Sequence, residues 1–386
     1  MIEGRDKQRR PEMAKILIVG GGFGGVVAAE SLAKKLGTEH QITLVSRSRK
    51  FLFYPALVRL AFGRGEPDDV SFDIRKAMLD RRVQFVEGEV ARIHPDERRI
   101  TFARGDFVGD MPYDFLVVAL GRRLKTEEVT GFFEHAHHLL GVRDAKKFGD
   151  AARNFSQGRA VIGSCPGSRL PVPLFETAFA LSLLLEERGK RDQCTITIAS
   201  SESPDEMFGG IAMTEALKGA LESNRIELVT DFAITQVTPN SVIAGDGRTL
   251  NCDLNMLIPP FGGPGGLVHT GIIDKEGYVQ VDSTMRVESA EGMYAVGDCV
   301  SFKGPKMGHM AVRQAEVAAE NLAAEIQGLS LPAVYDHEMM LVIDAGGESI
   351  FVHKDLWTDD EANLQHGRFW AWAKRIQEWH WKAKHA

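Results

Sequence analysis

The sequence has few cysteines, no long apolar run and no excess of positive charge, and each shortage excludes a class of protein. Four cysteines in 386 residues are too few for a disulfide framework, so any important cysteine is expected to act chemically. Apolar runs such as residues 178–185 are too short to span a bilayer. Lys and Arg number 46 against 53 Asp and Glu, a net charge of -7, which argues against a nucleic-acid partner.

The chain also lacks a secretory signal, because no apolar stretch with a small-residue cleavage site stands at its start. Residues 2–5, Ile-Glu-Gly-Arg, look like a protease recognition scar, and residues 1–13 are set aside as a tag. What is present, 44% hydrophobic and 26% charged residues, is typical of a folded globular protein. The length of 386 residues predicts two or three domains.

A glycine-rich turn follows the first apolar segment. Residues 15–19 predict a strand, and the turn Gly-Gly-Gly-Phe-Gly-Gly follows at 20–25. A helix is predicted at 26–36 and a second strand at 41–45. Glycine turns also serve purely structural strand-to-helix connections, but this order of elements is the context in which such a turn binds a dinucleotide.

Each glycine of the motif has a physical role in such a turn. Gly20 permits the sharp bend, Gly22 lets the backbone approach a pyrophosphate at the helix N-terminus, and Gly25 lets helix and strand pack closely. An acid usually binds the adenosine ribose at the end of the second strand. Here the sequence has Ser46 and Arg47 instead, which departs from the usual pattern.

The middle of the chain repeats the strand–helix pattern. Strands are expected at residues 159–163, 194–199 and 225–230, and a helix at 175–187. The sequence therefore predicts an α/β protein with two Rossmann-like dinucleotide-binding domains, the second inserted in the first. The predicted boundaries are 14–145 and 266–330 for the first domain, 146–265 for the second and 331–386 for a C-terminal segment.

Three motifs in this order resemble the pyridine-nucleotide-disulfide oxidoreductase superfamily of flavoproteins. They are the 20–25 turn, the apolar strand that ends at Gly121, and Tyr-Ala-Val-Gly-Asp at 294–298. The resemblance implies FAD as the cofactor, with Asp298 binding its ribityl chain. The alternative for Asp298 is an N-cap of a following helix.

The resemblance also implies a set of residues that contact FAD. They are Gly20, Gly22, Phe23, Gly24, Gly25, Ser46, Arg47, Pro55, Val90, Ala119, Gly121, Gly297, Asp298, Lys306 and Gly308.

Within the superfamily the chain is most similar to sulfide:quinone oxidoreductases and the flavoprotein subunits of flavocytochrome c sulfide dehydrogenases. The similarity lies in Phe-Leu-Phe-Tyr-Pro at 51–55, Gly-Ser-Cys at 163–165 with Glu176 downstream, Ile-Pro-Pro-Phe at 258–261 and Pro-Lys-Met-Gly at 305–308. Type II NADH dehydrogenases are the nearest rival. This branch implies two-electron transfer from sulfide or a related sulfur donor, through FAD, to a quinone.

The turn of the second domain discriminates between the two branches. An NADH-binding turn normally carries a second Gly-x-Gly-x-x-Gly, whereas here Cys165 and Pro166 stand between Gly163 and Gly167. Proline removes an amide donor and cysteine adds bulk where a phosphate would lie. We interpret this turn as one that has lost nicotinamide binding.

Cys165 is the predicted catalytic thiol, because a cysteine near a helix N-terminus has its thiolate favoured and could attack a flavin. The alternative is a small buried core residue. In the resembled branch a partner cysteine lies in the C-terminal strand segment, but residues 339–344 contain none and Leu341 stands near the expected place. An accessory cysteine is also missing from residues 139–143, so Cys165 would have to act alone.

Four further side chains are candidates with open alternatives. Glu176 could be a proton carrier at the flavin or a solvated carboxylate in the first turn of its helix. Lys306 could place positive charge near the reduced flavin or be a surface lysine. Phe261 and Phe53 could line a quinone pocket or belong to the core. No metal site is expected.

The C-terminal segment predicts a membrane-surface helix. Four of the five tryptophans lie between Phe369 and His385, interleaved with basic residues. A helix would align Phe369, Trp372, Ile376 and Trp379 along one face, as in an interfacial anchor. The alternative is an aromatic stripe packed into a dimer or domain interface. Trp370 and Trp381 lie off this stripe and are expected to be exposed unless lipid covers them, which favours the membrane.

Together these observations predict an FAD-dependent sulfide:quinone oxidoreductase, peripheral on the cytoplasmic side of the membrane and a homodimer or higher homo-oligomer. One alternative is an NADH:quinone oxidoreductase. The other, from a different class, is an FAD-binding redox-sensing or interaction protein without turnover.

Overall fold

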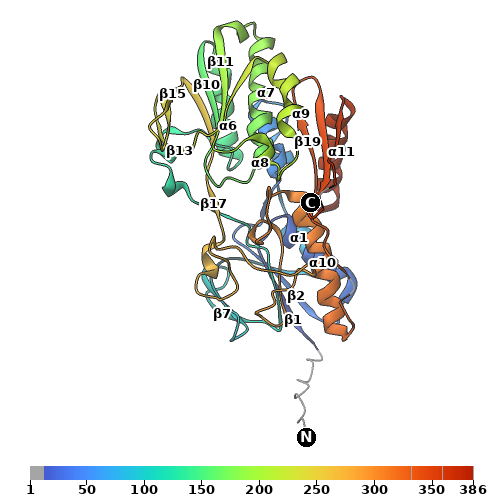
Figure 1. Cartoon of the computed structure of the whole chain (residues 1–386). Helices are drawn as coiled ribbons and strands as arrows, with labels where there is room; N and C mark the ends of the chain where they lie inside the picture. The colour runs from blue at the N-terminus through green and yellow to red at the C-terminus, as the bar shows by residue number, and fades with distance from the viewer. Residues whose placement is uncertain (1–12, 332, 359, 386) are drawn as a thin grey trace.

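The structure, a computed structural model, describes residues 13–331, 333–358 and 360–385. Two α/β domains lie one above the other, and the C-terminal strands and helix run along one side (Figure 1). Of the predicted tag, residues 1–13, only Met13 is described and the rest lies outside the described residues. The predicted α/β class is confirmed.

The first strand–turn–helix unit has the predicted topology. Strand β1 (Lys15–Val19) pairs in parallel with β2 (Gln41–Ser46), and helix α1 (Phe23–Leu36) joins them. The helix begins at Phe23 rather than at the predicted residue 26, because Gly22 already acts as its N-cap. Residues 16–19 of β1 are buried, as expected for a parallel strand covered on both faces.

The sheet of the first domain combines parallel and antiparallel strands. Its order in the described residues is β18-β8-β1-β2-β5-β6-β7. Strands β8 (Phe115–Val118) and β18 (Met293–Ala295) continue the parallel part beyond β1. The antiparallel β5 (Gln84–His94), β6 (Arg99–Gly105) and β7 (Gly109–Pro112) form the other edge. The carboxyl ends of β1, β8 and β18 therefore meet at one edge of the sheet, where a dinucleotide would bind.

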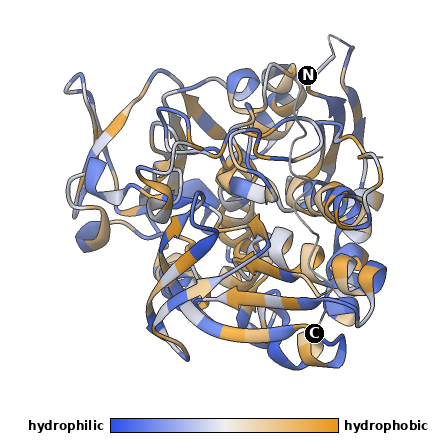
Figure 2. Cartoon of the chain, turned by 90° about the horizontal axis from the view of Figure 1, so that it is seen from below, coloured by the Kyte–Doolittle hydropathy of each residue, from blue (hydrophilic) through white to orange (hydrophobic). Residues whose placement is uncertain are grey.

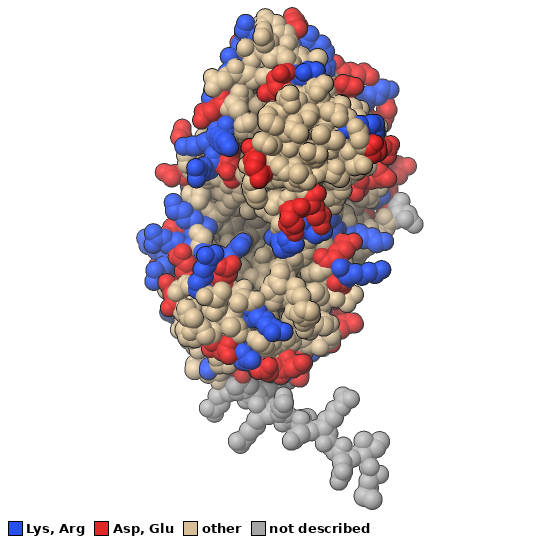
Figure 3. Space-filling view, turned by 90° about the vertical axis from the view of Figure 1, so that its left-hand side faces the viewer, with Lys and Arg blue, Asp and Glu red and all other residues tan. Residues whose placement is uncertain are grey.

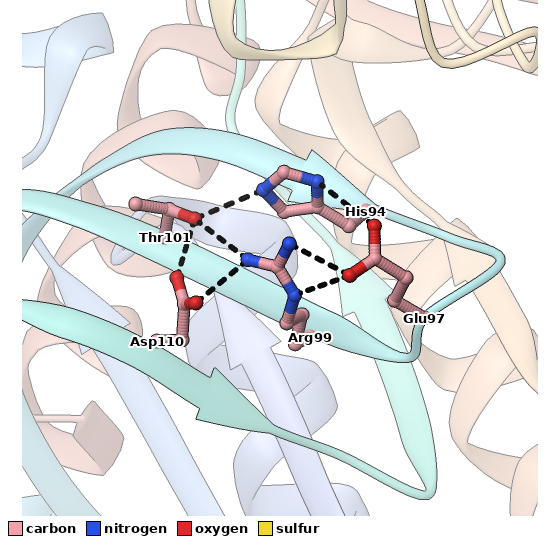
Figure 4. Close-up of polar contacts among 5 residues, drawn as sticks. All are labelled: His94, Glu97, Arg99, Thr101 and Asp110. Carbon is pink, nitrogen blue, oxygen red and sulfur yellow. Dashed lines mark hydrogen bonds and ion pairs between the residues drawn. The ribbon is translucent and has the colours of Figure 1, made fainter.

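A polar network fastens the antiparallel strands together (Figure 4). Arg99 donates to Glu97 and to Asp110, each at 2.7 Å, and Thr101 donates to Asp110 at 2.6 Å. His94 Nε2 lies 2.9 Å from Thr101 Oγ1. These side chains satisfy one another across β5, β6 and β7, so the network has a structural role.

The second domain has its own parallel sheet, in the order β12-β11-β10-β16 within the described residues. Its strands are β10 (Gly158–Ser164), β11 (Cys194–Ser200), β12 (Ile226–Val229) and β16 (Leu254–Ile258). Its main helices are α6 (Val142–Asn154), α7 (Pro171–Glu187) and α9 (Met213–Ser223). A small antiparallel sheet contains β13 (Ile234–Thr238), β14 (Ser241–Ala244) and β15 (Thr249–Asn251). The chain leaves and re-enters the first domain through the paired strands β9 (Arg123–Leu124) and β17 (Phe261–Gly262).

The last part of the chain forms a long helix, a small sheet and a terminal helix. Helix α10 (Gly308–Gln327) packs along α1. Residues 338–355 form a hairpin of β19 (Glu338–Asp344) and β20 (Ser349–Asp355), because Gly346 turns the chain with φ +84°. Strand β21 (Asn363–His366) completes this sheet, and α11 (Phe369–His385) follows.

Short elements fill the connections. They are β3 (Lys50–Leu52), α2 (Leu57–Ala61), α3 (Pro67–Val70), β4 (Ser71–Asp73), α4 (Arg75–Asp80), α5 (Phe132–His135) and α8 (Pro204–Met207).

Hydropathy and charge are distributed as in a folded globular protein. Hydrophobic residues are concentrated on the inner strands and on the inward sides of the helices (Figure 2). The face shown in Figure 3 carries Lys and Arg intermixed with Asp and Glu, and it is hollowed between the two domains. In the described parts of the chain, every helix is too short or too polar to cross a bilayer.

Candidate functional site

The glycine turn after β1 is shaped to hold a pyrophosphate. A Cβ on Gly20 would lie 2.0 Å from Ala119 O, and one on Gly25 would lie 1.7 Å from Gly20 O, so packing excludes a side chain at both. A Cβ on Gly22 would meet nothing within 4 Å. Gly22 is the N-cap of α1 and no side chain caps the helix, so its first amides can bind an anionic ligand. The residues present therefore fit a dinucleotide.

Neighbouring predicted residues converge on this turn from other elements. A Cβ on Gly24 would touch Val296 at 2.9 Å, and one on Gly308 would touch the Phe23 ring at 3.2 Å. Gly121 and Gly297 both have positive φ, +70° and +82°, which is compatible with the tight turns after β8 and β18.

Four further predicted contacts differ in how they meet the turn. Ser46 adjoins it, because a Cβ on Gly21 would lie 2.4 Å from Ser46 Oγ, although its hydroxyl donates to Ser48 O at 2.7 Å. Arg47 is exposed directly after β2, and Pro55 is exposed in a short 3₁₀ helix. Val90 lies on β5, and a Cβ on Gly266 would lie 3.5 Å from its carbonyl oxygen. Their contact with the cofactor stays a prediction.

Asp298 lies at the centre of the converging strand ends. It follows Gly297 in a short 3₁₀ helix, and its Oδ2 forms an ion pair with Arg122 Nη1. Helix α10 begins ten residues later with Met307 as its N-cap, so the alternative interpretation of Asp298 as the cap of that helix is wrong. Sequence reasoning missed Arg122, although its position directly after Gly121 was a signal that could have found it.

Lys306 is buried, which contradicts the alternative of a surface lysine. Its Nζ donates to Val300 O and lies 4.7 Å from the centre of the Tyr278 ring. Asp298 and Lys306 line the same small pocket, together with His337 and Gln314. Burial, and then the positive charge of Arg169, lower the pKa of Lys306 from 10.5 to about 8.

The lowered pKa of Lys306 predicts a stability change above pH 8. Between pH 8 and 10.5 the unfolded chain holds a proton that the folded chain has released, so wild-type stability should rise with pH relative to Lys306→Met. We expect a gain of about 2 kcal/mol between pH 7.5 and 9.5 in urea unfolding of the flavin-free proteins. If the difference in unfolding free energy between wild type and Lys306→Met is the same at pH 7.5 and pH 9.5, this prediction is wrong.

The turn of the second domain is built differently from that of the first. Helix α7 begins at Pro171, and Pro171 and Pro173 supply no amide donors to its first turn. Arg169 Nε donates to Gly304 O at 2.7 Å, and Arg169 O accepts from Lys306 N at 2.8 Å. A Cβ on Gly163 would lie 2.6 Å from Ile234 and Leu257, so this glycine serves packing. The turn is thus filled and fastened to the first domain.

Cys165 lies in the apolar core of the second domain, among Val161, Ala199 and Leu257. It is 2% exposed, and burial raises the pKa of its thiol well above the ordinary range. The expectation that a nearby helix N-terminus favours the thiolate is therefore wrong, because the cost of burying a charge outweighs it. In the described residues the other cysteines, Cys194, Cys252 and Cys299, are also buried and free. A catalytic role for Cys165 stays a prediction.

Glu176 is buried between three elements, so the alternative of a solvated first-turn carboxylate is wrong. Its Oε1 accepts from Asp344 N in β19 at 2.9 Å and from Lys374 Nζ in α11 at 2.6 Å. Burial raises the pKa of Glu176, and Lys374 opposes that shift. The carboxylate thus fastens β19 and α11 to α7, and its role as a proton carrier stays a prediction.

Phe261 and Phe53 are both buried, but in different surroundings. The Phe261 ring lies 4.2 Å from the Arg122 guanidinium. The Phe53 ring packs against Phe23 at 5.4 Å and Trp381 at 6.4 Å, between ring centres. Arg122 also lies 5.6 Å from the centre of the Tyr54 ring, so it contacts Phe261 and Tyr54, whereas Phe53 packs with Phe23 and Trp381.

Helix α11 exposes one aromatic stripe and packs the other tryptophans inward. Phe369, Trp372, Ile376 and Trp379 are 42–70% exposed. Trp370 stacks on Phe351 at 4.1 Å and Trp381 packs on Phe23 at 4.8 Å. The expectation that these two tryptophans are exposed without lipid is wrong, because the protein itself covers them.

Two lysines of α11 also face the protein. Lys374 pairs with Glu176, and Lys382 pairs with Asp69. Arg375 and Lys384 of the same helix are exposed.

Comparisons with known proteins agree with the geometry of the first domain. The family model for pyridine nucleotide-disulphide oxidoreductases matches residues 14–315. The chain is 28% identical over 343 residues to the sulfide-quinone reductase of Aquifex aeolicus (strain VF5), covering 82% of this chain and 77% of that protein. It is 25% identical over 363 residues to the type II NADH:quinone oxidoreductase of Haemophilus influenzae, covering 81% and 80%.

The solved structures show the same fold. The X-ray structure of the sulfide:quinone oxidoreductase from Aquifex aeolicus aligns with a TM-score of 0.87 and 23% identity, covering 96% of this chain and 91% of that one. Because the family model covers most of the chain and the glycine turn fits a dinucleotide, the chain belongs to the pyridine nucleotide-disulphide oxidoreductase family and is an FAD-binding oxidoreductase.

Proposed function

We propose that this protein passes two electrons from sulfide or a related sulfur donor, through FAD, to a quinone at a membrane surface. When bound, FAD accepts the electron pair from the donor and passes it to the acceptor. The names of the relatives support a quinone acceptor, because the sulfide-quinone reductase and the type II NADH:quinone oxidoreductase are both named for a quinone. The protein's own residues support the choice of donor.

The β10–α7 turn is the observation that carries the choice of donor. NADH needs backbone amides at a helix N-terminus for its pyrophosphate. At this turn Pro171 and Pro173 lack those amides, and Arg169 is committed to carbonyls of the first domain. A small sulfur donor needs no such cradle, which favours sulfide over NADH.

An aromatic cluster beside the glycine turn is our candidate for the quinone pocket. Trp381 packs on Phe23 and Phe51, with ring centres 4.8 and 5.8 Å apart, and Phe53 adjoins them. Flat aromatic rings stack on a quinone ring, and Phe23 belongs to the cofactor turn itself. In this proposal α11 contributes Trp381 to the quinone site as well as an exposed stripe.

The exposed stripe of α11 supports membrane attachment next to that pocket. Indole rings favour the headgroup region, and a quinone is itself dissolved in the bilayer. We place the protein on the cytoplasmic side, as a homodimer or higher homo-oligomer. Light scattering of the purified protein tests the oligomer, and a monomer would refute it.

An anaerobic titration of the flavin-loaded protein distinguishes the donors. We expect sulfide to remove the flavin absorbance, added quinone to restore it, and NADH at the same concentration to leave it unchanged. Bleaching by NADH alone would establish the NADH:quinone alternative. If neither donor bleaches the flavin, the protein is a redox-sensing or interaction protein.

The same titration tests Cys165. Because its thiol is buried and neutral, it has to be uncovered before a donor can reach it, and we expect Cys165→Ser to slow sulfide-dependent bleaching at least tenfold. Cys194→Ser is the matched control, since Cys194 is a buried, free cysteine of the same domain. Equal rates for wild type and both variants would refute the thiol step and leave direct reaction of sulfide with the flavin.

A further inference from the structure

Arg122 contacts both Asp298, the predicted ligand of FAD, and the aromatic rings of Phe261 and Tyr54. It follows Gly121 after β8, and its guanidinium pairs with Asp298. The centre of the guanidinium lies 4.2 Å from the Phe261 ring and 5.6 Å from the Tyr54 ring. The side chains of Arg122 and Asp298 are only 14% and 19% exposed, so water screens the pair weakly.

The chemistry of this arrangement suits a flat, permanent cation. A guanidinium stacks on an aromatic ring and binds a carboxylate at the same time, whereas an ammonium group is a point charge. The rings therefore fix the plane of Arg122, and Arg122 fixes one oxygen of Asp298. The contact that the described residues make to this carboxylate is at Oδ2, so Oδ1 can accept a hydrogen bond from a ligand hydroxyl.

We propose that Arg122 is a positioning residue that holds the Asp298 carboxylate for FAD and cancels its charge, which favours the reduced cofactor. This inference rests on the proposed contact of Asp298 with FAD. Two electrons and one proton leave the flavin with one more negative charge than before reduction. An unpaired carboxylate beside the flavin would repel that negative charge. The cation of Arg122 neutralises the carboxylate and so removes the repulsion.

Other cations in this region are committed elsewhere. Lys306 Nζ donates to Val300 O, and Arg169 donates to Phe302 O and Gly304 O. Arg122 thus forms the direct ion pair with Asp298 in the described part of the chain, whereas Lys306 acts on that carboxylate only through space.

The test is the midpoint potential of the bound flavin, measured anaerobically against indicator dyes. We expect Arg122→Met to weaken the binding of reduced FAD relative to oxidised FAD about tenfold, which lowers a two-electron potential by about 30 mV. Arg123→Met is the matched control, because Arg123 pairs with Glu127 at the surface, and its potential should equal that of wild type. Adding Asp298→Asn to Arg122→Met should return the potential toward the wild-type value.

The outcomes separate this inference from the cofactor assignment. An unchanged potential in Arg122→Met that still holds FAD overturns the inference. If Arg122→Met loses FAD, the potential and the FAD affinity of Arg122→Lys test the inference instead. It should keep the potential and raise the FAD dissociation constant severalfold, and wild-type affinity would overturn the positioning role. If Asp298→Asn binds FAD as tightly as wild type, the contact of Asp298 with FAD is wrong, whatever Arg122 does.

Discussion

Replacing Gly25 with alanine is expected to yield a protein that does not retain FAD and unfolds more readily than wild type. The added Cβ would lie 1.7 Å from the backbone oxygen of Gly20, and a backbone atom in a tight turn cannot move aside cheaply. Overpacking of this kind costs about 1–3 kcal/mol and distorts the amides that face the ligand. The flavin-to-protein ratio after purification and urea unfolding measure the two effects.

Gly22→Ala separates ligand contact from packing in the same turn. Its Cβ would meet no protein atom within 4 Å, so the apoprotein should lose only about 1 kcal/mol, the ordinary cost of alanine at an N-cap. The methyl group would instead stand where the pyrophosphate approaches, and we expect the FAD dissociation constant to rise at least tenfold. Wild-type affinity in this variant would show that Gly22 does not face the cofactor.

Exchanging Trp372 and Trp379 for glutamate is expected to abolish binding to vesicles of anionic phospholipid. The two side chains are 59% and 70% exposed on one face of α11. Burying an apolar side chain contributes roughly 1.5–3 kcal/mol, so losing both should weaken partition at least a hundredfold, before the repulsion of the new charges. Flotation with vesicles measures this.

Phe133→Glu is the control for that experiment, because Phe133 is 60% exposed on a different helix. It should bind vesicles as wild type does. If the double tryptophan variant still binds vesicles but changes from an oligomer to a monomer, the stripe is a subunit interface and not a membrane anchor.

Local patterns predicted the first domain well. The glycine turn, its flanking strands and the strand β8, which ends at Val118 rather than at the predicted Gly121, are encoded by neighbouring residues, because a tight turn and a buried parallel strand depend on local backbone geometry and apolar content. The same reasoning identified the stripe of α11, since helical spacing alone determines which residues share a face.

The state of the candidate site depended on residues far apart in the sequence. Arg122 meets Asp298 across 176 positions, and Lys374 meets Glu176 across 198, so no local spacing could pair them. The protonation of Cys165 was mispredicted for the same reason, since it depends on how completely other strands cover the thiol.

By itself, then, the sequence determined the family, the cofactor turn and the face of the terminal helix, because periodicity and short motifs govern these features. Tertiary structure alone decided which charges are paired, which thiol is neutral and which tryptophans face inward. Burial and charge pairing arise only when distant segments pack together, and their energies depend on that packing.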